Sequence, residues 1–186
     1  MTIYQEWPAA TLVWLLAGLH GALGLWWLLA PRAATRALAA FPRARAVGWG
    51  LTLIATLWVA LMVQQASLGR FAYLKAYLWP AAAVSYAAMV WALDELLAAR
   101  ALGGLLLLAA QPLLVAVRWH PSAARLLVVA LAYGWVVAGM TLTLSPYWFR
   151  RAAAFASKTP LRLRLAGLLA LSLAALFSLL AYRWSR

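Results

Sequence analysis

The chain has no cysteine, three acidic residues and two histidines among its 186 residues. The absence of cysteine excludes disulfides, thiol chemistry and cysteine-ligated metal clusters. Acids and histidines are too few for the ligand clusters of zinc or di-iron sites. The sequence also has no glycine-rich phosphate loop and no serine beside a basic partner in its apolar segments. We therefore expect a protein that is not an enzyme.

Hydrophobic residues, in contrast, are abundant. They make up 68% of the chain, and charged residues make up 10%, a composition that no single water-soluble core accommodates. A membrane-crossing helix needs about 20 mostly apolar residues. Six windows meet this requirement: 9–30, 46–65, 76–93, 101–118, 124–144 and 165–182. The sequence predicts an all-α integral membrane protein, with residues 1–186 forming a single membrane domain of six transmembrane helices.

A four-residue phrase, R-x-x-G, stands at the start of every second apolar window. Its copies are Arg45-Ala-Val-Gly48, Arg100-Ala-Leu-Gly103 and Arg164-Leu-Ala-Gly167. We expect Arg45, Arg100 and Arg164 to anchor the helices at the inner membrane interface. The three copies of this phrase divide the spans into three tandem helical hairpins with short loops, at about 9–65, 76–118 and 124–182. The short tip of the second hairpin predicts that its two spans lie antiparallel and side by side.

The loops between spans 1 and 2 and between spans 5 and 6 mix cations with apolar residues, a pattern typical of short interfacial helices. A shift of 115 residues places Gly24 on Gly139 and Pro31 on Pro146, so hairpins 1 and 3 are predicted to be diverged copies of one unit. The proline after span 1 and the R-x-x-G before span 2 resemble small two-helix inner-membrane proteins of bacteria. That resemblance implies no activity.

The net charge of +13 is unevenly distributed along the chain. The three hairpin tips carry ten Lys or Arg residues, whereas the termini and the other two loops carry six. The positive-inside rule therefore places the tips in the cytoplasm and both termini outside. We expect a bacterial cytoplasmic (inner) membrane protein whose cations meet anionic lipids, with no nucleic acid as a partner.

His20 is the one ionisable residue near the middle of a predicted span, and such residues are often functional. Its imidazole is either hydrogen-bonded to a neighbouring helix or an axial ligand to a tetrapyrrole, a haem or chlorophyll-type ring. The adjacent Gly18, Gly21 and Gly24 allow close approach by another helix or by such a flat ring. The cofactor itself is left unknown, and a bound lipid is expected.

Asp94 and Glu95 lie at the tip of the second hairpin, just ahead of a helix start. They either cap that helix and pair with Arg100, or form an ion or proton site.

By subtraction, the sequence favours a non-catalytic accessory or scaffolding subunit of a larger membrane complex. It would contact lipids, pigments or the helices of other membrane subunits. One alternative is a transporter of a small neutral solute, and another is a tetrapyrrole-binding membrane protein that uses His20.

Overall fold

The computed structural model describes residues 7–92 and 96–186, and the regular structure in these ranges is entirely helical. Eight α-helices and two 3₁₀ helices account for it, which confirms the predicted all-α class. The elements are α1 (Ala9–Leu29), α2 (Pro31–Ala40), η1 (Phe41–Arg43), α3 (Arg45–Gln65), η2 (Gly69–Tyr77), α4 (Leu78–Ala92), α5 (Leu97–Val117), α6 (Arg125–Leu144), α7 (Tyr147–Ala156) and α8 (Pro160–Trp184).

Five of these helices, α1, α3, α5, α6 and α8, are long and apolar enough to cross a membrane. They contain 20 to 25 residues each, matching the roughly 20 that a bilayer requires. At most 33% of the most apolar stretch of any of them is buried inside the protein. Most of their apolar surface therefore faces outward, as in a multi-pass membrane protein whose solvent is lipid.

The predicted third span, 76–93, appears as the shorter α4. This helix has 15 residues, so it rises roughly 22 Å at 1.5 Å per residue, less than the hydrocarbon thickness of about 30 Å. The nine residues before it, Gly69–Tyr77, form the 3₁₀ helix η2 and are largely exposed. Within residues 7–92 and 96–186, there are thus five helices of spanning length where the sequence predicts six.

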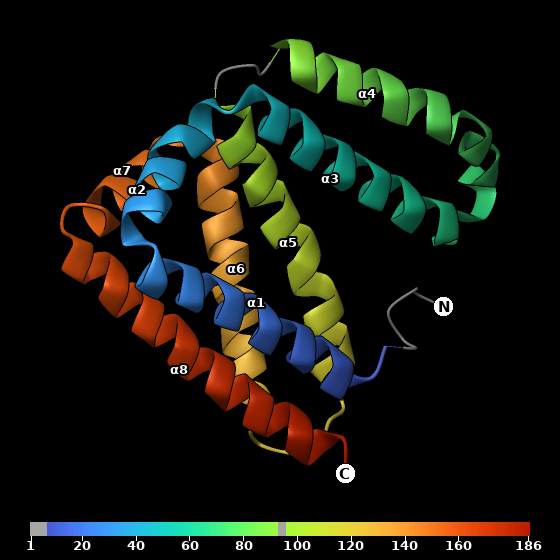
Figure 1. Ribbon diagram of the computed structural model, residues 1–186. Helices are drawn as coiled ribbons and strands as arrows, with labels where there is room; N and C mark the ends of the chain where they lie inside the picture. The colour runs from blue at the N-terminus through green and yellow to red at the C-terminus, as the bar shows by residue number, and fades with distance from the viewer. Residues whose placement is uncertain (1–6, 93–95) are drawn as a thin grey trace.

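The long helices do not pair within the predicted hairpins (Figure 1). Instead α1 packs along α8, α5 packs along α6, and α3 packs against α5 and α4. The ten-residue helix α2 lies between the two spans of hairpin 1, and the ten-residue helix α7 lies between the two spans of hairpin 3. Each short helix separates the two spans that it connects. The prediction that spans 3 and 4 lie side by side is also wrong for the described residues, because α4 lies against α3 and η2 rather than along α5.

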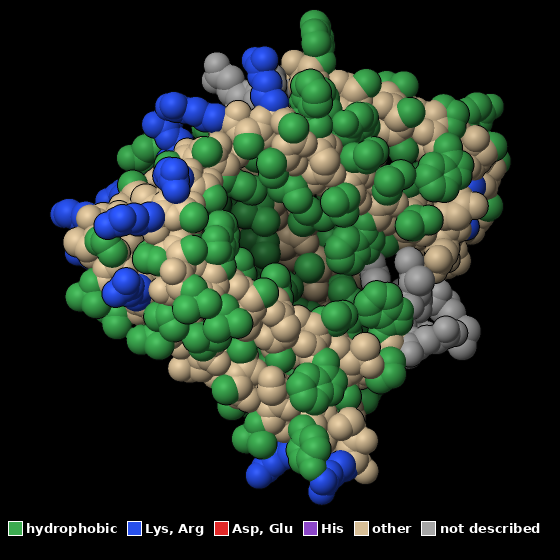
Figure 2. All heavy atoms as spheres, in the orientation of Figure 1, with side chains coloured by type: hydrophobic (Ala, Val, Ile, Leu, Met, Phe, Trp, Pro, Cys, Tyr) green, Lys and Arg blue, Asp and Glu red, His purple; other side chains and the backbone are tan. Residues whose placement is uncertain are grey.

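Helices α2 and α7 occupy the loops in which short helices were predicted, and they lie next to each other. The rings of Phe41 and Phe149, at the edges of this pair, are 4.9 Å apart. Lys and Arg side chains gather over this end of the molecule, whereas hydrophobic side chains cover most of the visible face (Figure 2). The order long helix, ten-residue helix, long helix occurs twice, as α1-α2-α3 and as α6-α7-α8, and this is the order that the predicted internal repeat requires.

The main core lies where α1, α5, α6 and α8 meet. Val13, Val117 and Val128 are at most 1% exposed there, and Phe177 of α8 packs among them. Helix α4 contributes nothing to this core, because none of its residues is buried. The four-helix core therefore holds the main cluster of buried residues, and α3 and α4 extend from it.

Candidate functional site

The glycines of all three R-x-x-G phrases are buried at helix crossings. Gly167 of α8 lies against Gly24 of α1, so closely that a Cβ added to Gly24 would stand 2.8 Å from the Gly167 carbonyl oxygen. Gly103 of α5 meets Gly139 of α6 in the same way, and a Cβ on Gly139 would stand 2.7 Å from the Gly103 oxygen. Only glycine permits such backbone approach, which maximises packing between helices in lipid.

These two contacts define what we call the glycine-locked pairs, α1/α8 and α5/α6. In each pair, a helix that carries R-x-x-G within its first eight residues packs against a helix that carries a glycine five residues before its end. In α5/α6, the second helix follows the first in the chain. In α8/α1, the two helices are the last and the first, and the start of α1 and the end of α8 lie at the same end of this pair (Figure 1).

The third pair in this series, α3/α4, has no such lock. Helix α4, Leu78–Ala92, contains no glycine. Gly48 of α3 instead faces the start of α5, where an added Cβ would stand 3.0 Å from the Ala98 nitrogen. Helix α3 is therefore held to α5, and α4 has no glycine with which to close onto α3.

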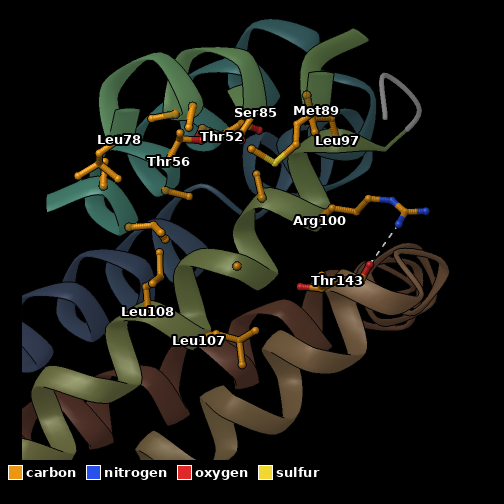
Figure 3. A pocket seen from close by; sticks show the side chains of 17 residues that line it. Thr52, Thr56, Leu78, Ser85, Met89, Leu97, Arg100, Leu107, Leu108 and Thr143 are labelled. Carbon is orange, nitrogen blue, oxygen red and sulfur yellow. Dashed lines mark hydrogen bonds between the residues drawn. The ribbon is translucent and has the colours of Figure 1, made fainter. Parts of the chain in front are cut away.

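A cavity of about 540 Å³ opens where this lock is missing, between α3, α4 and α5 (Figure 3). Its walls are largely small and aliphatic, and the lining side chains of the three helices surround one common space. The lining comprises Thr52, Ala55, Thr56, Val59 and Ala60 of α3; Leu78, Ala81, Ala82, Ser85 and Met89 of α4; Leu97, Arg100, Ala101, Gly104, Leu107 and Leu108 of α5; and Thr143 of α6.

The threonines of α3 add little polarity to this cavity. The Thr52 hydroxyl donates to the Gly48 carbonyl, and the Thr56 hydroxyl donates to the Thr52 carbonyl, each at 2.8 Å. Both donors are therefore used within their own helix, a common arrangement for threonine in an apolar environment. The middle of the cavity therefore suits an apolar ligand better than a polar one.

Arg100 is the single charged residue in the lining. Its Nη1 donates to the Thr143 carbonyl at 3.2 Å, near the C-terminal end of α6, where a cation is favoured by the helix dipole. Its side chain extends from α5 away from the labelled lining residues of α3 and α4 and towards Thr143 of α6 (Figure 3). The Arg100 Nε and the Thr143 hydroxyl are both buried and have no hydrogen-bond partner among the described residues.

The other predicted anchors lie at the same kind of position but away from the cavity. Arg45 begins α3 and Arg164 lies in the first turns of α8, and both are exposed. Asp94 and Glu95, predicted as a cap or an ion site, lie outside the described residues. So does Glu6, and the described part of the chain therefore contains no carboxylate side chain. It also contains no group of three potential metal ligands.

His20 packs against α8. Its Nδ1 lies 2.8 Å from the Leu16 carbonyl, and because a carbonyl only accepts, Nδ1 must carry the proton. Its ring lies 5.5 Å from that of Phe177. The hydrogen bond is thus to its own helix rather than to a neighbouring one.

The three glycines around His20 do not form one surface. Gly24 is covered by α8, and Gly21 is in ordinary contact with Ala174 of that helix, whereas Gly18 has nothing within 4 Å of its would-be Cβ. At 3.6 residues per turn, each step of three residues falls about 60° short of a full turn, so the stripe winds around the helix. Helix α8 already fills the space that a flat ring would need at Gly21 and Gly24.

No protein-family model, curated protein or solved structure matches this chain.

Sequence reasoning did not locate the cavity. Its lining is dominated by Ala and Leu, which are common throughout the spans and carry no signal of their own. The usable signal was a missing residue: of the three helices that precede an R-x-x-G phrase, α4 alone has no glycine near its end.

Proposed function

We propose that this protein is a non-catalytic accessory or scaffolding subunit of the bacterial cytoplasmic membrane, which contacts lipids and the helices of larger partners. The observation that carries the proposal is the open α3/α4 side of the molecule. Helix α4 has no buried residue, and Trp91 and Val84 on it are 87% and 69% exposed. A helix apolar on every side, with one neighbouring helix, needs lipid or another protein around it.

We further propose that η2 and α4 together make a sixth crossing. Their 24 residues run from Gly69 to Ala92 without a break in helical structure. Helix α4 runs back along α3 from η2 (Figure 1), and its rise of roughly 22 Å covers most of the hydrocarbon thickness of about 30 Å. This topology keeps both termini on the outer side and all three R-x-x-G phrases on the inner side. The cluster of Lys and Arg around α2 and α7 supports that orientation (Figure 2).

The absence of cysteine allows a direct test of this topology. Ala46→Cys and Leu161→Cys report on the inner side, and Phe71→Cys and Ala123→Cys report on the outer side; all four positions are exposed. In intact cells, a membrane-impermeant maleimide is expected to label only the second pair. Labelling of the first pair before lysis would contradict the orientation.

The subunit proposal is tested by extracting the protein from native membranes in a mild detergent. It predicts that larger membrane proteins co-purify in fixed proportion. An isolated, stable monomer that carries a neutral solute into liposomes would overturn it in favour of a transporter. A visible absorption band that disappears in His20→Ala would overturn it in favour of a tetrapyrrole protein.

A further inference from the structure

We infer that the cavity between α3, α4 and α5 holds one acyl chain of an anionic membrane phospholipid, whose headgroup is bound at the Arg100 end. The inference rests on the membrane location in the proposed function and names a ligand class and a site for it. Each part, the chain and the headgroup, is carried by separate observations.

The shape and lining of the cavity suit an acyl chain. Its lining residues on α5 run from Leu97 to Leu108, a rise of roughly 16 Å at 1.5 Å per residue, so the space extends along the helix rather than across it. Its volume of about 540 Å³ falls within the range of roughly 300–1,000 Å³ of small-molecule sites. The Thr52 and Thr56 hydroxyls are bonded within α3, so an alkyl chain leaves no donor of theirs unpaired.

The charge at one end of the cavity suits an anionic headgroup. Arg100 is the one charged residue of the lining and lies near the start of α5, and the described residues have no carboxylate side chain to neutralise it. Its Nη1 donates to the Thr143 carbonyl and its Nε is buried, so Nη2 is the guanidinium nitrogen left for a ligand. A phosphodiester oxygen accepts from a guanidinium in the charge-assisted geometry that makes arginine a preferred phosphate ligand.

The cavity also lies where the repeated packing fails. The α1/α8 and α5/α6 pairs are closed by backbone contact at Gly24 and Gly167 and at Gly103 and Gly139, which leaves no room between them. A second hollow, between α2 and α7, has a volume of only about 190 Å³. The cavity beside the α3/α4 pair thus has both the space and a cation, Arg100 of α5, and a lipid chain there would replace the missing helix contact.

Two glycines with open space around them make a clean test possible. Gly104 lines the cavity, and a Cβ added there meets nothing within 4 Å, so Gly104→Leu fills the cavity without displacing backbone. Gly134 of α6 is equally open but is not part of the lining, so Gly134→Leu is the matched control for the same change in a helix. Ala82→Leu fills the same space from α4 and serves as a second variant if Gly104→Leu does not fold.

Native mass spectrometry measures the lipid that each purified variant retains after incubation in detergent with equal amounts of phosphatidylglycerol and phosphatidylcholine. The wild-type protein and Gly134→Leu are expected to retain one phosphatidylglycerol. Gly104→Leu fills the cavity and is expected to retain about tenfold less phosphatidylglycerol. Arg100→Gln is expected to show a similar loss, because one charge-assisted hydrogen bond is worth about that factor. Arg100→Lys keeps the charge and is expected to lose less than Arg100→Gln.

Three results would overturn the inference. Equal retention of both lipids would contradict selection for an anionic headgroup. Equal retention of lipid by Gly104→Leu and by the wild-type protein would contradict binding in the cavity. Loss of a co-purifying partner in Gly104→Leu, with lipid retention unchanged, would assign the cavity to a partner helix instead. Because partner capture and lipid retention are measured separately, failure of the lipid site leaves the subunit proposal standing, and failure of the subunit proposal leaves the lipid site standing.

Discussion

The glycine-locked pairs α1/α8 and α5/α6 have glycine on both helices where they meet, whereas α4 of the unlocked pair α3/α4 has none. This difference changes how closely the two helices of a pair approach each other. Where two glycines meet, the backbones touch and both glycines are buried. Where α4 has no glycine, it buries no residue, and a cavity of about 540 Å³ remains beside it. In a membrane, where apolar burial alone does not hold helices together, close packing decides which pairs form.

The largest effect is expected from Gly103→Leu. A side chain at this position meets the Thr143 hydroxyl oxygen and the Gly139 carbonyl oxygen at 2.7 and 2.8 Å, so α5 and α6 must separate. We expect a loss of about 3 kcal/mol or more in the free energy of unfolding, the upper range for overpacking. Thermal unfolding in detergent measures it, and Gly104→Leu, one residue along the chain, is the control. Equal melting temperatures for the two variants would contradict the lock.

A smaller but more diagnostic effect is expected from alanine at the locks. Gly24→Ala and Gly167→Ala each disrupt the same α1/α8 contact, so each is expected to cost about 1–3 kcal/mol, and the double variant less than the sum of the two. Gly24→Ala combined with Gly103→Ala affects both locked pairs, and those costs should add. A double-variant cycle of unfolding free energies separates these cases. Additivity within one pair would show that the two glycines are not in one contact.

A third prediction concerns local stability without any substitution. Few buried contacts hold α4, so its amides are expected to exchange with deuterium faster than those of α8, which buries seven residues. Hydrogen-exchange mass spectrometry in detergent measures this directly. Added phosphatidylglycerol should slow exchange in α4 and leave α8 unchanged. Equal protection of the two helices without lipid would contradict the expected difference in local stability between the unlocked pair and the glycine-locked pairs.

The smallest effect is expected at Thr56. Thr56→Val keeps the side-chain shape and removes a hydroxyl that bonds only within α3, so stability should change by less than about 1 kcal/mol. Retention of phosphatidylglycerol should be unchanged as well. A transporter that used this threonine along a polar path would instead lose flux in liposomes. Thr56→Val therefore separates an apolar site from a solute pathway.

Much of the local structure was readable from the sequence. The starts of the long helices fall within about five residues of the predicted ones, because long apolar windows and the proline and R-x-x-G boundaries are strong signals. The short helices α2 and α7 were likewise predicted from their mixed cationic and apolar character. The predicted span 76–93 was the exception, since its first residues belong to the 3₁₀ helix η2 and not to an α-helix.

The packing partners were not readable in the same way. The R-x-x-G phrase was interpreted as a helix start with an arginine anchor, but its glycines, Gly48, Gly103 and Gly167, each mark a helix crossing. The glycines of α1 were treated as one surface, but only Gly24 and, more loosely, Gly21 face α8. Sequence spacing gives the rotation of a residue around its own helix and not the identity of the helix opposite.

The sequence by itself determined that the chain is helical, that its long segments are apolar enough for a membrane, and that a phrase ending in glycine recurs at their starts. These properties are local, since length, hydropathy and the allowed approach at a glycine belong to each segment alone. Only the tertiary structure decided that α8 packs with α1 rather than with α6, and that α4 stands open beside the Arg100 cavity. That choice depends on which surfaces fit one another across distant parts of the chain, and no single segment carries this information.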